Sequence, residues 1–137
     1  MTIPFLACMA GVAAVYHLPL RLLPAIQAVE GGRPGLVHVN TDGSQDLGVM
    51  QVNTRWVQPL AWQTGIAPAA AGQRLLLDGC FNIAVAGAIM RIYLNEARGN
   101  LLLAVGHYHS HTPLLAQAYQ LRVLHSAARL FGAGSPR

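Results

Sequence analysis

The sequence predicts a mainly α-helical protein with one small β-hairpin, in which helices surround a cleft and the hairpin follows the second helix. Three observations support this fold class. Much of the apolar 53% of the 137 residues is Ala and Leu, which favour helices. Helix start and stop signals recur along the chain. Residues with strand character flank a single turn cluster at 40–44.

The N-terminal part is expected to form two helices and then the hairpin. The first helix covers residues 3–15 and the second runs from Pro19 to Glu30. Pro19 suits a helix start, whereas Pro24 must lie near the first turn or bend the helix. A Gly-Gly pair directly after Glu30 ends the helix. The hairpin occupies residues 36–53, with Val37, Val39, Val49, Met50 and Val52 as its strand residues.

The remainder of the chain is expected to be helical. Residues 54–67 form irregular or short helical connections, and residues 68–76 form a short helix. Asp78 caps a long helix that ends near Arg98, and an apolar helix follows at residues 100–108. The last helix starts with Thr112 as its cap and Pro113 as its first residue, and it ends at Phe131. Residues 1–131 therefore form one domain, and residues 132–137 form a flexible tail.

The charge pattern narrows the classes of partner. The chain carries a net charge of +4 with nine Arg and no Lys, so it is attracted to polyanions. The arginines are spread singly and no nucleic-acid motif occurs, which argues against nucleic acid. No stretch reaches the roughly 18 apolar residues of a membrane span. The apolar N-terminus lacks the basic region of a secretory signal and is interpreted as the first helix.

Glu30 is the most unusual of the five acidic residues. Asp78 is a helix cap, Asp42 belongs to the turn, and Glu96 is expected to be solvated on an exposed helix face. Glu30 instead ends an apolar helix, where the helix dipole and burial both raise the pKa of a carboxyl group. A carboxyl that stays protonated near neutral pH suits a general acid. Asp46 is the second candidate.

Four segments together resemble the lysozyme-like superfamily. They are VEGGRPG at 29–35, NTDGSQDLGVMQVN at 40–53, DGCFNI at 78–83 and LAVGHYHS at 103–110. In that superfamily a helix ends in the catalytic Glu and a hairpin carries a Gly-x-Met-Gln-x-Asn strand. The last segment is similar to the third motif of soluble lytic transglycosylases. The resemblance covers residues 8–123 and is nearest to the small transglycosylases that accompany type III and type IV secretion systems and pili.

The resemblance implies a peptidoglycan lytic transglycosylase of lysozyme-like α+β fold. Glu30 would be the catalytic acid and base, and Met50, Gln51 and Asn53 would line the glycan cleft. Tyr108 would lie near the Glu30 carboxyl and orient it or the sugar. The implied reaction cleaves the MurNAc–GlcNAc β-1,4 bond and leaves a 1,6-anhydroMurNAc end. It implies a periplasmic monomer that needs no cofactor or metal, and secretion-system or pilus proteins as partners.

Two positions depart from the family pattern, and two cysteines have a counterpart in it. The family commonly has Ser after the catalytic Glu, where this chain has Gly31, and a small residue before the motif Tyr, where it has His107. The spacing of Cys8 and Cys80 suits no zinc site, and the residues alone allow either buried thiols or a disulfide. The subgroup commonly pairs cysteines at these places, which implies a disulfide.

Asp46 leaves a second enzymatic interpretation open. Its segment also resembles the hairpin of animal C-type lysozymes, in which the last Asp is the second catalytic carboxylate, so Asp46 would support hydrolysis. Otherwise Asp46 braces the hairpin and stays ionised near the cleft. A third interpretation is an inactive module that binds glycan or a protein partner. The intact Glu30 argues against a pure binding role.

Several further residues allow more than one role. His107, His109 and His111 would form a metal site on one face of a strand, but on a helix only the outer two share a face. A packing or cleft-lining role is favoured for them. Trp56 and Trp62 either stack on sugar rings or pack in the core. Tyr119 and Val123 are expected to be packing positions.

Overall fold

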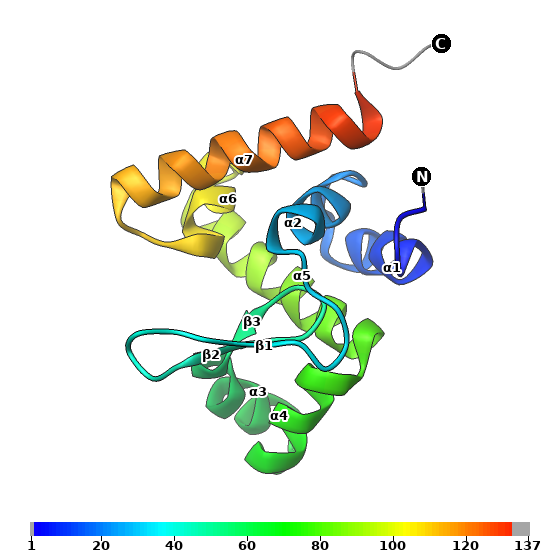
Figure 1. The fold of residues 1–137 in the computed structure, drawn as a ribbon, viewed down its shortest axis with the longest axis vertical. Helices are drawn as coiled ribbons and strands as arrows, with labels where there is room; N and C mark the ends of the chain where they lie inside the picture. Colours follow the sequence, from blue (N-terminus) through cyan, green and yellow to red (C-terminus); the bar gives the residue numbers. More distant parts are fainter. Residues whose placement is uncertain (1, 133–137) are drawn as a thin grey trace.

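The computed structural model describes residues 2–132, which form seven α-helices, one short 3-10 helix and a three-stranded sheet (Figure 1). The prediction of a mainly α-helical fold with a small β element is confirmed. The elements are α1 Leu6–Tyr16, α2 Leu22–Glu30, β1 Val37–Val39, β2 Gln45–Leu47, β3 Val52–Asn53, η1 Thr54–Trp56, α3 Val57–Thr64, α4 Pro68–Leu77, α5 Gly79–Glu96, α6 Leu101–His109 and α7 Pro113–Phe131.

Helix α5 is the central element of the fold and passes through the middle of the molecule (Figure 1). Helix α1 packs against it so closely that a Cβ added at Gly87 would collide with the side chain of Val12. A disulfide between Cys8 of α1 and Cys80 of α5 joins the same two helices, with their Cα atoms 5.5 Å apart. The small residue and the covalent link therefore hold the N-terminal helix on the core.

Helix α7 crosses the molecule and packs on α2 and α6 (Figure 1). The buried Ser126 donates a hydrogen bond of 2.9 Å to the backbone oxygen of Ala25 in α2. Gly106 of α6 lies against Ala116 of α7, and a Cβ at Gly106 would lie only 2.9 Å from the Ala116 Cβ. These contacts place the face of α7 that carries Tyr119 beside the end of α2.

The β element is a three-stranded antiparallel sheet in the order β1-β2-β3, one strand more than the predicted hairpin. The expectation that Val49 and Met50 belong to a strand is wrong, because residues 48–51 form a turn. Gly48 and Gln51 both adopt left-handed backbone conformations, with φ of 72° and 53°, which reverses the chain between β2 and β3. The register places Asp46 opposite both His38 and Asn53.

The predicted helix start is correct for α7 but wrong for α1, which begins at Leu6 rather than at residue 3, and for α2. Helix α2 begins at Leu22 rather than Pro19, which puts Pro24 in the first turn, where its missing N–H leaves no helical bond unmade. Pro113 is the first residue of α7, but the Thr112 side chain makes no capping hydrogen bond. Asp78 does cap α5, since its Oδ1 accepts a 3.0 Å bond from the Phe81 N–H.

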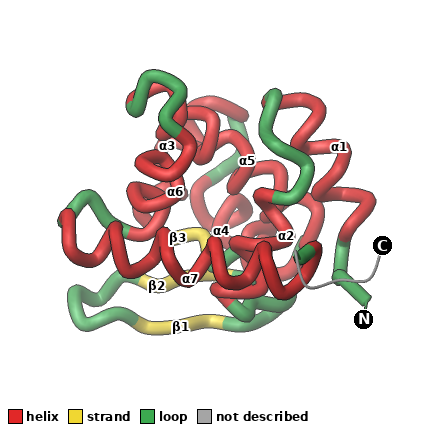
Figure 2. Tube along the Cα trace, turned by 90° about the horizontal axis from the view of Figure 1, so that it is seen from above, coloured by secondary structure: helices red, strands yellow, loops and turns green. Residues whose placement is uncertain are grey.

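The sheet lies at one edge of the helical body, and its β1–β2 turn and the α6–α7 connection extend toward the same side in both views (Figure 2). Within residues 2–132 no single helix has both the length and the apolar composition of a membrane span. Helices α4 and α5 together meet the length and composition criteria but are bent by 106°. The predicted tail, apart from Gly132, lies outside the described residues.

Candidate active site

Glu30 is the last residue of α2, and the backbone around it is shaped by two glycines. Gly31 closes the helix in a left-handed conformation with φ of 66°, and its N–H donates to the Gln27 oxygen at 2.8 Å. A Cβ at Gly32 would collide with the carbonyl oxygens of Gly48 and Val49. The end of α2 therefore rests directly on the turn between β2 and β3, and Glu30 faces the space beside the sheet.

Tyr119 of α7 holds the Glu30 carboxyl. Its hydroxyl donates a hydrogen bond of 2.6 Å to Glu30 Oε2, and its ring is only 2% exposed. The prediction that Tyr119 is a packing position is confirmed by its burial in the core, and the structure adds the hydrogen bond to Glu30. A buried Tyr generally requires a hydrogen-bond partner for its hydroxyl. The expected packing of Tyr119 was therefore the one sequence signal that pointed to this bond.

The pKa of Glu30 is raised above its ordinary value, chiefly because burial disfavours the charged carboxylate. The negative charge of Asp46 raises it further. The hydrogen bond from Tyr119 and the charges of Arg122 and His38 oppose this effect without reversing it. Burial and the nearby Glu30 charge also raise the pKa of the Tyr119 hydroxyl, which therefore remains a proton donor.

Tyr108 lies in the cleft near Glu30, as the resemblance implied, whereas its expected action on Glu30 or on the sugar stays a prediction. Its hydroxyl donates a hydrogen bond of 3.0 Å to the backbone oxygen of Met50, not to Glu30. Burial raises the Tyr108 pKa well above its usual range, and the Glu30 and Asp46 charges add to the effect. Tyr108 thus lies near Glu30 in the same cleft, but the group that it fixes is the turn before β3.

Met50 does not line the cleft, contrary to the expectation from the resemblance. Its side chain is 0% exposed and belongs to the core, because the turn at residues 48–51 directs it inward. Its N–H donates a 2.8 Å hydrogen bond to Oδ1 of Asn82. Asn82 is fully buried and its amide also donates to the carbonyl oxygens of Leu47 and Leu75, both at 2.8 Å. Sequence reasoning missed this anchor of the turn.

Gln51 and Asn53 do line the cleft, and Asp46 lies with them. The Gln51 amide donates 2.9 Å to the Gly48 oxygen, which supports its left-handed backbone. The Asn53 amide donates to Asp46 Oδ1 at 2.9 Å, and the other Asp46 oxygen lies 3.7 Å from Nδ1 of His38. Asp46 is therefore bound into the sheet while it faces the same space as Glu30.

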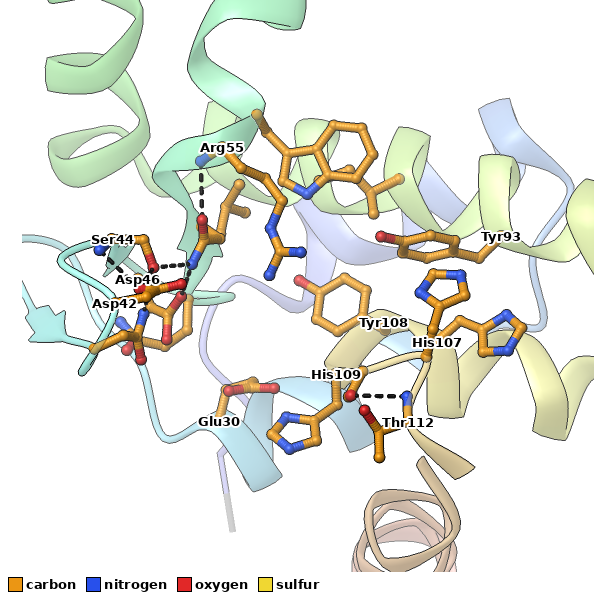
Figure 3. A pocket seen from close by; sticks show the side chains of 18 of the residues that line it. Glu30, Asp42, Ser44, Asp46, Arg55, Tyr93, His107, Tyr108, His109 and Thr112 are labelled. Atoms are coloured by element: carbon orange, nitrogen blue, oxygen red, sulfur yellow. Dashed lines mark hydrogen bonds between the residues drawn. The ribbon is translucent and has the colours of Figure 1, made fainter. Parts of the chain in front are cut away.

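The cleft has a volume of about 490 Å³ and is open to solvent. In Figure 3, Arg55 extends its guanidinium toward the middle of the cleft from the side of the sheet, and Glu30 lies with His109 at the opposite wall. The lining of the cleft is mostly polar. It comprises Glu30, Asn40, Thr41, Asp42, Ser44, Asp46, Gln51, Val52, Asn53, Arg55, Trp56, Ile89, Tyr93, His107, Tyr108, His109, Ser110, His111 and Thr112. Such a polar groove suits a hydroxyl-rich chain such as a glycan.

Aromatic rings shape both ends of the cleft. His109 stacks on Tyr119 with centroids 4.9 Å apart and planes 7° apart, and burial, followed by the charge of Arg122, lowers the His109 pKa. Trp56 lines the cleft and meets Tyr93 edge to face at 6.1 Å, so it is available to contact a sugar. Trp62 is 91% exposed on α3 and does not line this cleft, so the expectation that it packs in the core is wrong.

The chain matches a known protein family over most of its length. Residues 7–120 match the family described as "Transglycosylase SLT domain". This chain belongs to the SLT transglycosylase family. Members of this family are lytic transglycosylases, lyases that act on peptidoglycan. The match runs from Ala7 in α1 to Gln120 in α7 and so includes Glu30, the sheet, Tyr108 and Tyr119.

Curated relatives of this SLT domain are known from Salmonella. "Invasion protein IagB" of Salmonella typhimurium (strain SL1344) is 33% identical over 110 residues, which cover 77% of this chain and 62% of the relative. The protein of the same name from Salmonella typhi gives the same identity and coverage. The chain therefore spans less than two thirds of the length of the curated relatives that it matches.

The structure shows the surroundings of Gly31 and His107, the two residues that depart from the SLT pattern. At Gly31 no atom lies within 4 Å of an added Cβ, but the φ of 66° would strain any side chain other than glycine there. His107 is half-buried at the cleft and directs Nδ1 to within 3.0 Å of Glu96 Oε1. Glu96 is exposed, as expected, but it also pairs with His107 and His111.

Proposed function

We propose that this SLT domain is a peptidoglycan lytic transglycosylase, with Glu30 as its catalytic acid and base. It would cleave the β-1,4 bond between MurNAc and GlcNAc and form a 1,6-anhydroMurNAc end. The observation that carries the proposal is a carboxyl group of raised pKa that Tyr119 positions at the wall of an open polar cleft. We further propose that residues 1–131 act as one domain.

The reaction needs one group that first gives and then takes a proton. Protonated Glu30 donates its proton to the glycosidic oxygen as the bond to C1 of MurNAc breaks. The 2-acetamido group of the sugar assists at C1 in the absence of a protein nucleophile. The Glu30 carboxylate then removes the proton of the C6 hydroxyl, whose oxygen bonds to C1. Glu30 is reprotonated, no water is consumed, and the GlcNAc 4-hydroxyl leaves.

The charge balance of the cleft supports both roles of Glu30. Burial favours the protonated carboxyl at the start, whereas the Tyr119 hydrogen bond and Arg122 stabilise the carboxylate that forms on proton transfer. Gln51, Asn53 and Arg55 offer polar groups to the sugars along the sheet side of the cleft. The side-chain amides of Gln51 and Asn53 are held by hydrogen bonds before substrate arrives, whereas the hydrogen bond of Arg55 to Asn53 is made by its backbone N–H.

A hydrolytic muramidase is the second candidate, and Asp46 is the observation that favours it. Asp46 lines the same cleft, and its charge acts on Glu30. It would then stabilise the positive charge at C1 or act as the nucleophile, as second carboxylates do in retaining glycosidases. The hydrogen bond from Asn53 and the nearby His38 favour a bracing role instead.

Mass spectrometry of muropeptides released from purified peptidoglycan distinguishes these candidates. The wild-type protein should release products that end in 1,6-anhydroMurNAc, and the Glu30→Gln variant should release none. The Asp46→Asn variant, which makes the same carboxyl-to-amide change, should still form anhydro products. Reducing-end products one water heavier that require Asp46 would establish a hydrolase. Absence of any Glu30-dependent release would refute both enzymatic roles and leave a glycan-binding module.

We also propose that the protein opens the cell wall locally for a secretion system or pilus, as a monomer in the periplasm and without a cofactor. The similarity to proteins named for invasion supports this context. A deletion strain should lose assembly of the apparatus and regain it with wild type but not with Glu30→Gln. Full complementation by Glu30→Gln would show that cleavage is not the contribution of this chain.

A further inference from the structure

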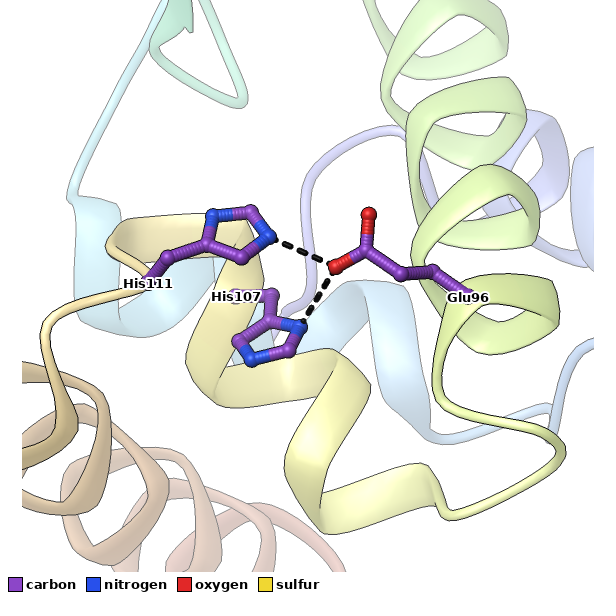
Figure 4. A group of neighbouring side chains, drawn as sticks. All are labelled: Glu96, His107 and His111. Carbon is purple, nitrogen blue, oxygen red and sulfur yellow. Dashed lines mark hydrogen bonds and ion pairs between the residues drawn. The ribbon is translucent and has the colours of Figure 1, made fainter.

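Three side chains outside the reacting centre converge at the far end of the cleft. Glu96 comes from the end of α5, His107 from α6 and His111 from the α6–α7 connection (Figure 4). His111 Nε2 lies 2.6 Å and His107 Nδ1 lies 3.0 Å from the same oxygen, Oε1 of Glu96. The possible ligand atoms all lie within 4.8 Å of one another. We propose that Glu96, His107 and His111 form a binding site for a divalent transition-metal ion, Zn²⁺ foremost.

The donor set matches this class of ion. Two imidazole nitrogens and one carboxylate oxygen are a ligand set found in zinc sites that keep a further position open. Imidazole ligands suit Zn²⁺, Cu²⁺ and Ni²⁺, whereas Mg²⁺ and Ca²⁺ prefer sites built of oxygen alone. Ligands about 2.1 Å from a tetrahedral Zn²⁺ lie about 3.4 Å from one another. The nitrogen–oxygen distances of 3.0 Å for His107 and 2.6 Å for His111 therefore need to lengthen by less than about 1 Å to admit the ion.

His107 carries the strongest indication of a missing partner. The side chain is only 15% exposed, and its Nδ1 atom is buried with no hydrogen bond of acceptable geometry, although Glu96 Oε1 is 3.0 Å away. A buried polar atom without a partner is costly, and native proteins generally supply one. A cation bound between His107 Nδ1 and Glu96 Oε1 would be coordinated by both atoms and would give the nitrogen the partner that it lacks.

The two imidazole rings are held in place before any ion binds. They stack with centroids 4.0 Å apart and planes 21° apart. The ring of Tyr93 meets His107 edge to face at 6.2 Å and His111 at 5.4 Å. His109 is excluded from the group because it stacks on Tyr119 instead. His107 and His111, which are four residues apart, are thus the two histidines that form the site.

The site is accessible and joins three segments that form one end of the cleft. The side chains of His111 and Glu96 are 55% and 47% exposed, so an ion can enter from solvent and water can complete its coordination. Bound metal would connect the end of α5 to α6 and to the connection that precedes α7. It would therefore stabilise this end of the cleft, without any part in the proton transfers at Glu30.

Calorimetric titration of tag-free protein with ZnCl₂, near neutral pH in a buffer free of chelators, tests the site. We expect one Zn²⁺ per chain in the wild-type protein. The variants His111→Ala and Glu96→Gln should each bind at least about tenfold more weakly, because each removes one ligand. Both positions are partly exposed, so the fold should tolerate these changes. His125→Ala, at an exposed histidine of α7, is the matched control and should bind like wild type.

A thermal melt gives a second readout that does not depend on cell-wall cleavage. Zn²⁺ should raise the melting temperature of wild type and of His125→Ala but not of His111→Ala, because a ligand that binds only the folded state stabilises it. Absence of saturable one-to-one binding overturns the proposal. Binding of equal strength in His111→Ala and in wild type overturns it as well. Neither result bears on the role of Glu30.

Discussion

Replacement of Tyr119 by Phe isolates the hydrogen bond that positions the proposed acid. The hydroxyl donates 2.6 Å to Glu30 Oε2, and this bond lowers the pKa that burial has raised. A hydrogen bond to a charged group contributes about 1.5–3 kcal/mol. Its loss disfavours the carboxylate, so the pKa of Glu30 should rise further. Since 1.36 kcal/mol corresponds to one pKa unit, the alkaline limb of the pH–rate profile should move upward by about one pH unit or more.

The assay is the initial rate of muropeptide release at limiting peptidoglycan, measured across pH for wild type, Tyr119→Phe and Tyr108→Phe. Tyr108→Phe removes a hydroxyl from the same cleft, but one that is bonded to the Met50 backbone. The control should therefore lose activity or stability without moving the alkaline limb. An unmoved limb in Tyr119→Phe, or an equal movement in both variants, would refute the assignment of Tyr119 as the residue that positions Glu30.

Three further predictions concern stability. Glu30→Gln should gain stability relative to wild type as pH rises from below 4.5. The pKa of Glu30 is raised in the folded state, so the unfolded wild-type chain ionises first and is favoured as pH rises. Urea melts at acidic and at mildly alkaline pH would show this, and a stability difference independent of pH would contradict it. Asn82→Ala should lower the free energy of unfolding by about 3 kcal/mol or more, since it leaves three buried backbone groups without their partner; a loss below about 1 kcal/mol in a denaturant titration would argue that the turn has other support. Double replacement of Cys8 and Cys80 by Ser should cost about 4 kcal/mol by the chain-entropy relation for a separation of 72 residues, and equal melting temperatures of the two proteins would exclude a stabilising disulfide.

Local signals in the sequence predicted the helices well. The Gly-Gly pair after Glu30, the Asp78 cap and Pro113 are effective within a single turn of helix, so neighbouring residues suffice to recognise them. The same reasoning failed at the turn before β3. Gln51 adopts a left-handed conformation that its residue type does not favour, and the buried Asn82, far along the chain, holds the turn in place.

The candidate site shows the same difference between local signals, which the sequence reveals, and long-range contacts, which it does not. Glu30 was recognised from its place at the end of an apolar helix, but its partner was not, because Tyr119 is 89 residues away and meets it only where α7 packs on α2. Glu96 is exposed as its helix face predicted, but its pairing with two histidines was not predicted, because they lie 11 and 15 positions further along the chain, after a reversal of direction. Hydrogen-bond partners at such separations depend on helix packing, for which a single sequence provides no local pattern.

By itself the sequence determined the helices, the position of the turn cluster and the acid at the end of α2, because these depend on residues within a few positions of one another. Only the tertiary structure decided which groups surround that acid. It placed Tyr119 on Glu30, moved Met50 into the core and brought Glu96, His107 and His111 together. The physical reason is that burial and long-range hydrogen bonds arise when helices pack, and packing is a property of the whole chain.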